Sequence, residues 1–590
     1  MRHVQIALLL LTALLPAGAY GQAARPAWPT LERQLREERA PIAPDSALGK
    51  LIRSNQDFGM LRPEEAGDNL PVPPWLRVWW RKAHPAGRFP ANDPTGGYPL
   101  VLKEIHEWMV SHPDLQGGDG TLHEKRGGHP KPTVTFTGGP ELEISGPEVE
   151  PRSESDIRIN FWNSDQIISA SNNISGNGAL AVFSSQDGGG SWRQTTLPKE
   201  ASAFHSDPTV EWTSDGTAWA TALSITGSTL VGDAFRSTDG GVTWKLDGPF
   251  SGDQQDVDKQ MTWVDHFDGS PFKDTLYAIW HNGEQVFVNR RTADGWGQPL
   301  QVSGDETAGT GIGADIKTNQ QGTVFAFWPD TGTQKIFMTR STDGGNSFSR
   351  PLAIGKTFAD FQFSIPAQFR RNALIYVTGG AFYRGPKRNQ NLVYAAWADL
   401  AGGRGCSSPA DQPGNNRASG CTSRIWFTRS TNGGISWSRP GMINNQRDTN
   451  DQFNPWLAVD PTSGTLGIIY YDTIGEERPL TNVWAQVSSD DGASWSAPYR
   501  VTAEASNEND GLPNGNQYGD YNGLSGYAGT FFPAWTDRRG GFGTKEAIWT
   551  APLTLQLKAR SAAAAEKMCP FAPLSAGEAL ETLLQPACTQ

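Results

Sequence analysis

Tyrosine, carboxylate and guanidinium side chains gather in two short stretches near the C-terminal end of the sequence. NQYGDYNG contains Tyr518, Asp520 and Tyr521, and WTDRR contains Asp537 and Arg538. Such groups close together suit nucleophilic or acid/base chemistry on a glycan, since a hydroxyl, a base and a cation are all present. They equally suit sugar binding without turnover, or a structural network that closes the fold. We expect these five residues to lie together and leave the three roles open.

A second chemical signal is the number of aspartates at the ends of strand-like runs and in loops. Four runs end in WPD, WAD, YYD and WTD, and two loops read DQQDVDK and RDTNDQFNPW. Carboxylates around a narrow channel are typical ligands of a hard cation, so we expect a structural calcium ion and no other cofactor. The predicted ligands are Asp256, Asp258 and Asp451. The alternative is that each aspartate caps its own turn.

One eight-residue word occurs five times in the chain. Gly-Gly in the word supplies positive φ without steric cost, and its Asp can accept hydrogen bonds from the amides of the turn. Asn432 replaces the Asp in one copy and Phe348 replaces the Trp in another. A catalytic carboxylate would not survive replacement by an amide, so we interpret the word as scaffolding. The copies are SQDGGGSW, STDGGVTW, STDGGNSF, STNGGISW and SSDDGASW.

The elements around each copy predict the fold. Runs rich in β-branched and aromatic residues give the order strand, turn, strand, repeated turn, strand, with a further strand before each unit. Seven such units can be counted, with second strands beginning near residues 166, 217, 276, 323, 392, 466 and 531. Repeats of about four short strands predict an all-β, seven-bladed propeller of antiparallel blades, with six blades as the alternative. The last unit lacks an outer strand, and residues 132–145 are the expected donor.

The repeated word, in this strand context, resembles the Asp-box or BNR repeat of the sialidase superfamily over residues 155–553. The resemblance implies that the repeated turns lie on the face opposite the active site. It also implies an arginine clamp for a sugar carboxylate, a Tyr–Glu nucleophile and an Asp acid/base. Arg158 in DIRINFW matches the first arginine, although Ile157 and Asn160 replace the aromatic residue and the proline of the family motif. The loop SNNISGNG, where the acid/base Asp is expected, contains no carboxylate.

These signals favour a protein that acts on carbohydrate, with sialidase-like glycoside hydrolysis as the expected reaction. The alternative is a propeller that binds a glycan or a protein without catalysis. The formal net charge of −12 argues against nucleic acid as a partner, because phosphate recognition needs a basic face. We expect a monomer.

The ends of the chain predict export. An apolar run after Arg2 and His3, with small residues at Ala19 and Gly21, is typical of a signal peptide over residues 1–21. This run is too short for a good membrane span. Four cysteines form two local pairs, which we expect as two disulfides in an oxidising compartment: Cys406 with Cys421 and Cys569 with Cys588.

The remaining organisation follows from where the strand rhythm stops. Residues 22–131 are expected to be a helical N-terminal extension, and residues 132–553 the propeller. Residues 554–590 are expected to be a short tail held by the second disulfide.

Overall fold

The computed structural model of the chain describes most of the predicted propeller and little outside it. The residues described are 134–146, 151–173, 178–381, 391–402, 406, 408–416, 419–444, 449–474, 478–508, 517–539 and 546–557. Within these ranges the chain is nearly all β, and its one named helix is the single 3-10 turn η6 (Pro409–Asp411). No helix among these residues has the length and apolar character that a membrane span requires. The predicted signal peptide, the helical extension, most of the tail and the Cys569–Cys588 pair lie outside them.

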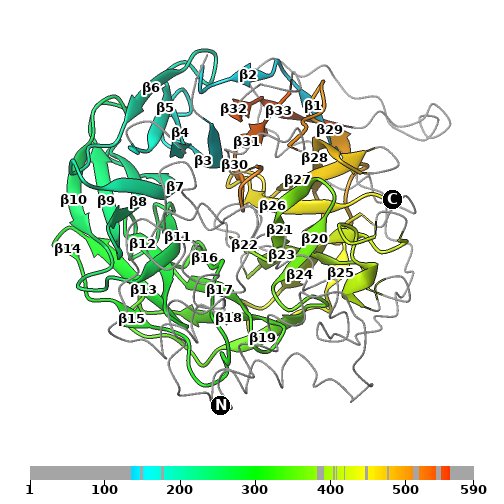
Figure 1. Ribbon diagram of the computed structural model, residues 1–590. Coiled ribbons are helices and arrows are strands. Elements are labelled where there is room, and N and C mark those ends of the chain that lie inside the picture. The colour runs from blue at the N-terminus through cyan, green and yellow to red at the C-terminus, as the bar shows by residue number, and fades with distance from the viewer. Residues whose placement is uncertain are drawn as a thin grey trace, which may run out of the picture.

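Seven blades stand around a central channel, so the seven-bladed prediction is confirmed and the six-bladed alternative is wrong (Figure 1). Each blade is an antiparallel sheet whose strands run in chain order from the channel outward. Blade 1 is β3 (Arg152–Ile159), β4 (Ile167–Asn173), β5 (Ala181–Ser185) and β6 (Arg193–Thr196). Blade 2 is β7 (Phe204–Trp212), β8 (Ala218–Thr226), β9 (Thr229–Ser237) and β10 (Lys245–Pro249). Blade 3 is β11 (Val257–Val264), β12 (Leu276–Asn282), β13 (Gln285–Thr292) and β14 (Gly295–Trp296), with β15 (Leu300–Gln301) also on β13.

The next three blades repeat this order. Blade 4 is β16 (Asp315–Thr318), β17 (Val324–Asp330), β18 (Lys335–Ser341) and β19 (Leu352–Lys356). A separate hairpin, β20 (Gln362–Ile365) with β21 (Gln368–Leu374), comes before the next blade. Blade 5 is β22 (Val377–Ala381), β23 (Val393–Leu400), β24 (Ser423–Ser430) and β25 (Gly441–Met442). Blade 6 is β26 (Gln452–Val459), β27 (Leu466–Ile474), β28 (Leu480–Ser488) and β29 (Tyr499–Arg500).

Blade 7 closes the ring with strands from both ends of the described chain. Its inner strands are β30 (Gly523–Tyr527), β31 (Thr530–Asp537) and β32 (Ala547–Thr550). The outer strand is β2 (Leu142–Glu143), which pairs with β32, while β1 (Val134–Gly138) pairs with β33 (Leu553–Leu557). The predicted strand donor is therefore confirmed. An ion pair between Arg539 Nη1 and Glu141 Oε2, at 2.5 Å, adds to the same seam.

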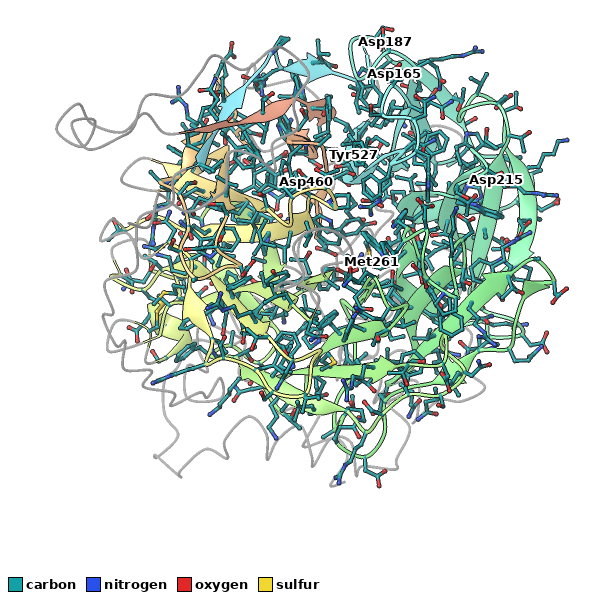
Figure 2. All side chains as sticks on the ribbon, turned by 180° about the vertical axis from the view of Figure 1, so that it is seen from behind. Asp165, Asp187, Asp215, Met261, Asp460 and Tyr527 are labelled. Carbon is teal, nitrogen blue, oxygen red and sulfur yellow. A yellow bond between two sulfur atoms is a disulfide. The ribbon has the colours of Figure 1, made fainter. Side chains whose placement is uncertain are left out.

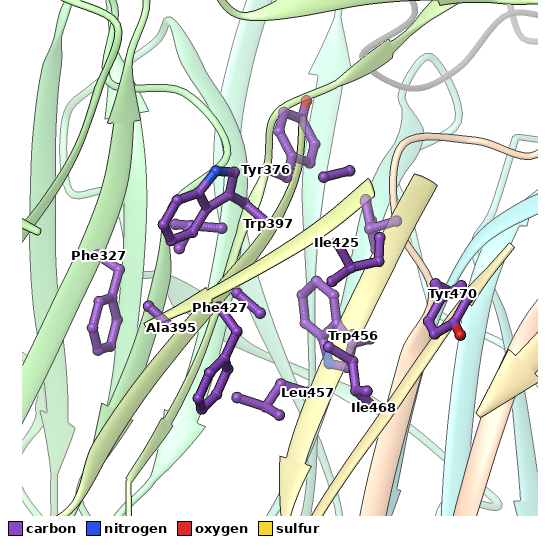
Figure 3. Close-up of a cluster of buried hydrophobic side chains, with 14 of the residues drawn as sticks. Phe327, Tyr376, Ala395, Trp397, Ile425, Phe427, Trp456, Leu457, Ile468 and Tyr470 are labelled. Carbon is purple, nitrogen blue, oxygen red and sulfur yellow. The ribbon is translucent and has the colours of Figure 1, made fainter. Parts of the chain in front are cut away.

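Apolar side chains fill the spaces between blades, because a four-stranded sheet cannot cover both of its own faces. In Figure 3, Phe327 and Trp397 lie between blades 4 and 5, whereas Phe427 and Ile468 lie between blades 5 and 6. Polar side chains of the innermost strands also join neighbouring blades. The contacts are Asp156 to Val210 N (2.9 Å), Thr209 to Thr262 (2.6 Å), Asp315 to Gly379 N (2.7 Å), Thr378 to Leu457 N (3.1 Å) and Ser525 to Ile159 N (3.1 Å).

The repeated word forms the turn between the third and fourth strands, as predicted. In the first copy, Asp187 accepts hydrogen bonds from Ser191 N at 2.9 Å and from Ser191 Oγ at 2.6 Å. Its two glycines, Gly188 and Gly189, have φ of 70° and 90°. The side chain of Trp192 donates to Gly189 O at 3.1 Å. The carboxylate is therefore a turn acceptor, and its role is structural.

Several of these turns also bind their blade to the one before it. In three places an arginine on the third strand of a blade donates to a carbonyl in the next repeated turn. The pairs are Arg290 with Gly344 (2.7 Å), Arg340 with Gly433 (2.7 Å) and Arg429 with Asp491 (2.6 Å). The repeated turns therefore stabilise the ring as well as the individual blades.

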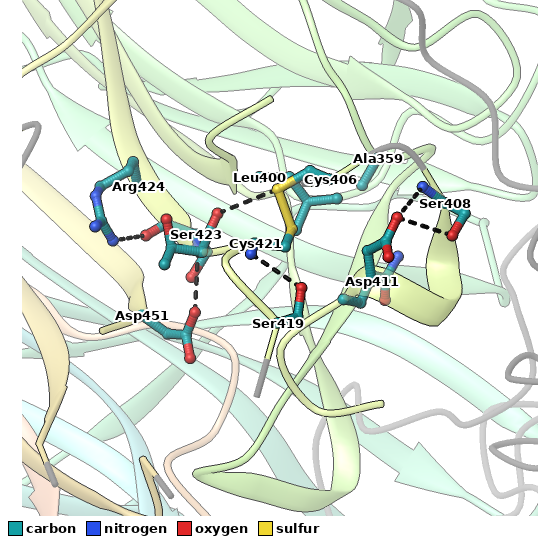
Figure 4. Close-up of a disulfide and its surroundings, with 12 residues drawn as sticks. Ala359, Leu400, Cys406, Ser408, Asp411, Ser419, Cys421, Ser423, Arg424 and Asp451 are labelled. Atoms are coloured by element: carbon teal, nitrogen blue, oxygen red, sulfur yellow. Dashed lines mark hydrogen bonds between the residues drawn. A yellow bond between two sulfur atoms is a disulfide. The ribbon is translucent and has the colours of Figure 1, made fainter. Parts of the chain in front are cut away.

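A disulfide joins Cys406 to Cys421 in the long connection between β23 and β24 (Figure 4). Gln412 in the enclosed loop accepts a hydrogen bond from Ser364 N, at 2.9 Å, and so binds the loop to the β20–β21 hairpin. The first of the two predicted disulfides is confirmed.

Candidate functional site

The central channel has two chemically different ends, which the strand register distinguishes. In blade 1, Ile159 pairs with Ile167, and Ile167 pairs with Ser185, the first residue of a repeated turn. The Ile159 end of β3 is therefore the end of the repeated turns, which we call the lower end (Figure 2 looks onto that face and labels Asp165 and Asp187). The Arg152 end of β3 is the upper end.

Four innermost strands carry a β-bulge near the upper end, and each bulge contains a residue other than glycine with positive φ. These residues are Glu154 in β3, Asp207 in β7, Lys259 in β11 and Asn454 in β26, with φ of 55°, 54°, 47° and 45°. A left-handed conformation costs a side-chain-bearing residue about 1–3 kcal/mol. Bulges re-aim side chains and are common beside active sites. The repetition of this strain in four blades identifies the upper end of the channel as the candidate site.

Contacts between blades that are not neighbours show that Lys259 meets two tyrosines on the axis. The ammonium group of Lys259, from blade 3, lies 3.4 Å from the ring centroid of Tyr521, which precedes the first strand of blade 7. It also lies 5.4 Å from the ring of Tyr376, which precedes the first strand of blade 5. We call the following residues the upper axial cluster: Glu154, Asp207, Lys259, Tyr376, Asn454, Asp520 and Tyr521. All seven are buried.

A chain of polar contacts links a tyrosine to two carboxylates in this cluster. The hydroxyl of Tyr376 donates to Asp520 Oδ2 at 3.5 Å, and the amide of Asp520 donates to Glu154 Oε1 at 3.3 Å. The second oxygen of Glu154 accepts from Asn172 Nδ2 at 2.5 Å. A hydroxyl beside one carboxylate, with a second carboxylate close by, can perform nucleophilic and acid/base catalysis.

Two glycines make room for these side chains. A Cβ at Gly519, where φ is 69°, would lie 2.5 Å from Cγ of Glu154. A Cβ at Gly313, where φ is 77°, would lie 2.1 Å from the ring of Tyr376. The positions of Glu154 and Tyr376 therefore depend on glycine in the neighbouring backbone.

Of the five residues predicted from the C-terminal stretches, Asp520 and Tyr521 reach the axis. Tyr518 packs between blades 6 and 7, where its hydroxyl accepts from Thr481 Oγ1 at 2.8 Å and its ring lies 4.6 Å from that of Tyr471. The other two are bound to neighbours in the wall of the ring. Asp537 accepts from Arg539 Nη2 at 2.6 Å, and Arg538 forms an ion pair with Glu508 at 3.7 Å. Of the five predicted residues, two therefore lie on the axis and three lie in the wall of the ring.

Arg158 lies at the lower end of the channel, away from the predicted partners. It is the penultimate residue of β3, and its Nε lies 2.9 Å from Glu211 Oε1. Arg158 and Arg538 therefore do not form one clamp with each other, and Arg158 is on the side of the repeated turns.

The three predicted metal ligands do not form one site. Asp256 and Asp258 are in blade 3, where Asp258 lies 3.6 Å from His281 Nε2. Asp451 precedes β26 and lies 3.3 Å from Arg478 Nη1, and burial raises its pKa to about 7 against the lowering effect of that guanidinium. No group of three or more acidic, histidine or cysteine side chains suited to a metal is found among the residues that the structure describes. These three residues therefore do not provide one shared site for the predicted calcium ion.

Other aspartates of the predicted rim bind backbone amides. Asp330 accepts from Gly309 N at 2.8 Å and Gly332 N at 3.2 Å, and Asp399 accepts from Leu400 N at 2.7 Å. Asp399 also accepts from Phe358 N at 2.6 Å and Ala359 N at 3.0 Å, so these aspartates join separate loops as well as bind amides of their own turns.

Sequence reasoning missed Glu154, Lys259 and Tyr376. A signal for two of them exists in the alignment of the innermost strands with one another. The bulge residues of β3, β7, β11 and β26 occupy the same place, two positions before Asp156, Thr209, Met261 and Trp456. Tyr376 has no such signal, because it becomes recognisable only through its contact with Asp520.

Comparisons with known proteins find likeness in the fold and none in sequence families. No protein-family model matches the chain, and no curated protein matches it. Three of the similar solved structures illustrate how low the sequence identity and the TM-score are. A Dyadobacter fermentans protein of unknown function is 13% identical, with 72% of this chain and 100% of that chain covered and a TM-score of 0.39. The intramolecular trans-sialidase from Ruminococcus gnavus is 11% identical, with 68% and 94% covered and a TM-score of 0.33. The polysaccharide lyase Uly1 is 9% identical, with 69% and 91% covered and a TM-score of 0.39.

Proposed function

We propose that this chain is a carbohydrate-active propeller that hydrolyses a glycosidic bond at the upper axial cluster. The observation that carries the proposal is the contact chain from Tyr376 through Asp520 to Glu154 on the channel axis. Four strained backbone positions around the axis support it, because strain of this kind is maintained where function requires it. The buried setting strengthens electrostatic interactions between these groups and a developing charge.

The proposed reaction is a double displacement. The hydroxyl oxygen of Tyr376 forms a bond to the anomeric carbon while the bond from that carbon to the leaving oxygen breaks. Asp520 takes the hydroxyl proton, and Glu154 gives a proton to the leaving oxygen. Water then attacks the anomeric carbon and gives a proton to Glu154, while the tyrosine oxygen leaves and takes its proton back from Asp520.

The test is a panel of fluorogenic glycosides, including sialosides, with the purified protein and two variants. Asp520→Asn and Tyr376→Phe are each expected to lower kcat/KM by about 10²–10⁴-fold. Asp239→Asn is the matched control for charge, because the equivalent turn position is naturally Asn432. Tyr277→Phe is the control for the loss of a buried hydroxyl in blade 3. Both controls are expected to stay within about twofold of the parent.

Two results would contradict hydrolysis. Glycan binding without turnover of any glycoside would identify a recognition module that uses the same cluster. Loss of turnover in the two controls to the same extent as in the axial variants would show that stability is responsible.

We further propose that the protein is exported. The Cys406–Cys421 disulfide supports this, since such bonds persist in oxidising compartments. Mass analysis of the mature N-terminus tests it, with cleavage after residue 21 as the expected result.

A further inference from the structure

A small cavity lies on the axis at the lower end of the channel, away from the upper axial cluster. Its volume is about 10 Å³, roughly the least room that one water needs. One side of the wall is apolar and includes Ala381, Trp456 and Val459. The other side contains Arg158 and Lys317, and the half-buried ring of Phe161 lines the lower edge.

Both ionisable side chains in the lining are cations. Lys317 Nζ lies 2.5 Å from Asp315 Oδ1, and Arg158 Nε lies 2.9 Å from Glu211 Oε1. Neither of these carboxylates belongs to the lining. Asp315 is turned toward the backbone, where it accepts from Gly379 N at 2.7 Å. A third carboxylate, Asp156, has its Oδ1 3.9 Å from Arg158 Nη2 and is also outside the lining. The charged groups that line the cavity are therefore the two cations.

The two cations share one aromatic ring. Arg158 Cζ lies 4.9 Å and Lys317 Nζ 4.7 Å from the ring of Trp263, so both are positioned by the same side chain. Burial lowers the pKa of the Lys317 ammonium, Asp315 opposes that effect, and the charge of Arg158 adds to it. An anion between the two cations would reduce their mutual repulsion in a region of low dielectric.

We propose that this cavity binds one small monovalent inorganic anion of the halide class, held between Arg158 and Lys317. The site joins blade 1 to blade 4 across the channel, so it exists only in the closed ring. A ligand that binds only the folded state raises its stability by mass action. Chloride is therefore expected to stabilise the propeller.

The first experiment compares thermal unfolding of the full-length protein in sodium chloride and in sodium gluconate at equal ionic strength. We expect chloride to raise Tm by about 2–4 °C over gluconate. Lys317→Met is expected to abolish this difference. Lys273→Met is the matched control, because Lys273 is a more exposed lysine beside Trp162 outside the cavity, and it should leave the difference unchanged.

A second variant and a direct measurement keep the test decisive even if Lys317→Met misfolds. Asp315→Asn with Lys317→Met removes the whole ion pair and so leaves no buried charge of that pair without its partner. In crystals grown in bromide, the anomalous signal should show a peak between Arg158 and Lys317. Equal Tm values in chloride and gluconate for the parent protein, or a cavity that contains only water in bromide, would overturn the proposal.

Discussion

Two of the regions in which positive φ occurs differ in the residues that adopt it. In the repeated turns the conformation falls mainly on glycine, as at Gly240 and Gly241 with φ of 77° and 87°. At the upper end of the channel it falls on Glu154, Asp207 and Lys259. The first region is relaxed and the second is strained. The comparison teaches that the same backbone conformation stabilises the ring in one place and, in our proposal, serves the reaction in the other.

The carboxylates of the two regions differ in the same way. Asp187 in a turn is exposed, and hydrogen bonds from Ser191 lower its pKa to about 2. Asp520 is buried on the axis and contacts the hydroxyl of Tyr376. An amide can replace the former, as Asn432 shows, whereas the proposed proton transfer requires a carboxylate at the latter.

The largest loss of stability is expected when a glycine of a repeated turn receives a side chain. A Cβ in Gly492→Ala would lie 2.4 Å from the ring of Phe427, at a φ of 78°. Overpacking and left-handed strain together should cost about 3 kcal/mol of unfolding free energy. Denaturant melts measure this cost, and kcat/KM per folded molecule should not change. A melt equal to that of the parent would show that the turn does not need glycine.

The converse change removes strain from the axis. Asp207→Gly is expected to change the unfolding free energy by no more than about 1 kcal/mol, because the relief of strain at a φ of 54° is offset by the unfolded-state entropy of glycine and by loss of the hydrogen bond from Ser206 Oγ at 2.7 Å. Turnover should fall, since the variant removes one member of the cluster. Paired melts and kinetics measure the two effects. A variant that is both less stable and fully active would reverse the comparison between the two regions.

A change in stability alone, without a change in turnover, is expected from a natural exchange within the repeat. Trp437→Phe removes the hydrogen bond from Trp437 Nε1 to Gly434 O, at 3.2 Å, and should cost about 1 kcal/mol. Phe348 already occupies the equivalent place in another copy, so the ring should still close. Denaturant melts check the size of the change, and the same exchange at Trp192 serves as its replicate.

The smallest effect is the acid dependence of the exposed turn carboxylates. The pKa of Asp187 and that of Asp343 are each lowered from 3.8 to about 2, by hydrogen bonds from Ser191 and from Ser341. A depressed folded pKa gives stability that is present above about pH 4 and is lost as the pH falls toward 2. Tm measured across this window should fall less steeply for the double variant Asp187→Asn/Asp343→Asn. Identical slopes would show that these hydrogen bonds do not favour the ionised form.

The sequence predicted the blades well because each blade repeats a local pattern. The second strands begin at residues 167, 218, 276, 324, 393, 466 and 530, each within one residue of the predicted start. Alternation of side chains along short strands and glycine in the turns are properties of neighbouring residues, so they can be read without the fold. The strand donated by Leu142–Glu143 followed from counting a missing strand in the last unit.

The candidate site was harder to predict, because residues close in sequence separated in space. Tyr518 and Tyr521 are three positions apart, yet one packs in a seam beside Tyr471 and the other faces Lys259 on the axis. Both precede β30, whose pairing with β31 is regular, so the path of the chain before that strand decides which of them faces the channel. A sequence window cannot show the path that the chain takes between two blades.

By itself, the sequence predicted seven blades with six as the alternative, and it predicted the structural role of the repeated turn and the first disulfide. These depend on spacing and on the conformational preferences of individual residues. Only the tertiary structure decided that Lys259, Tyr376 and Tyr521 meet, and that Arg158 lies at the opposite end of the channel from Asp520. The physical reason is ring closure: side chains from blades 3, 5 and 7 reach one another only across the axis of a closed circle, a relation that no local pattern encodes.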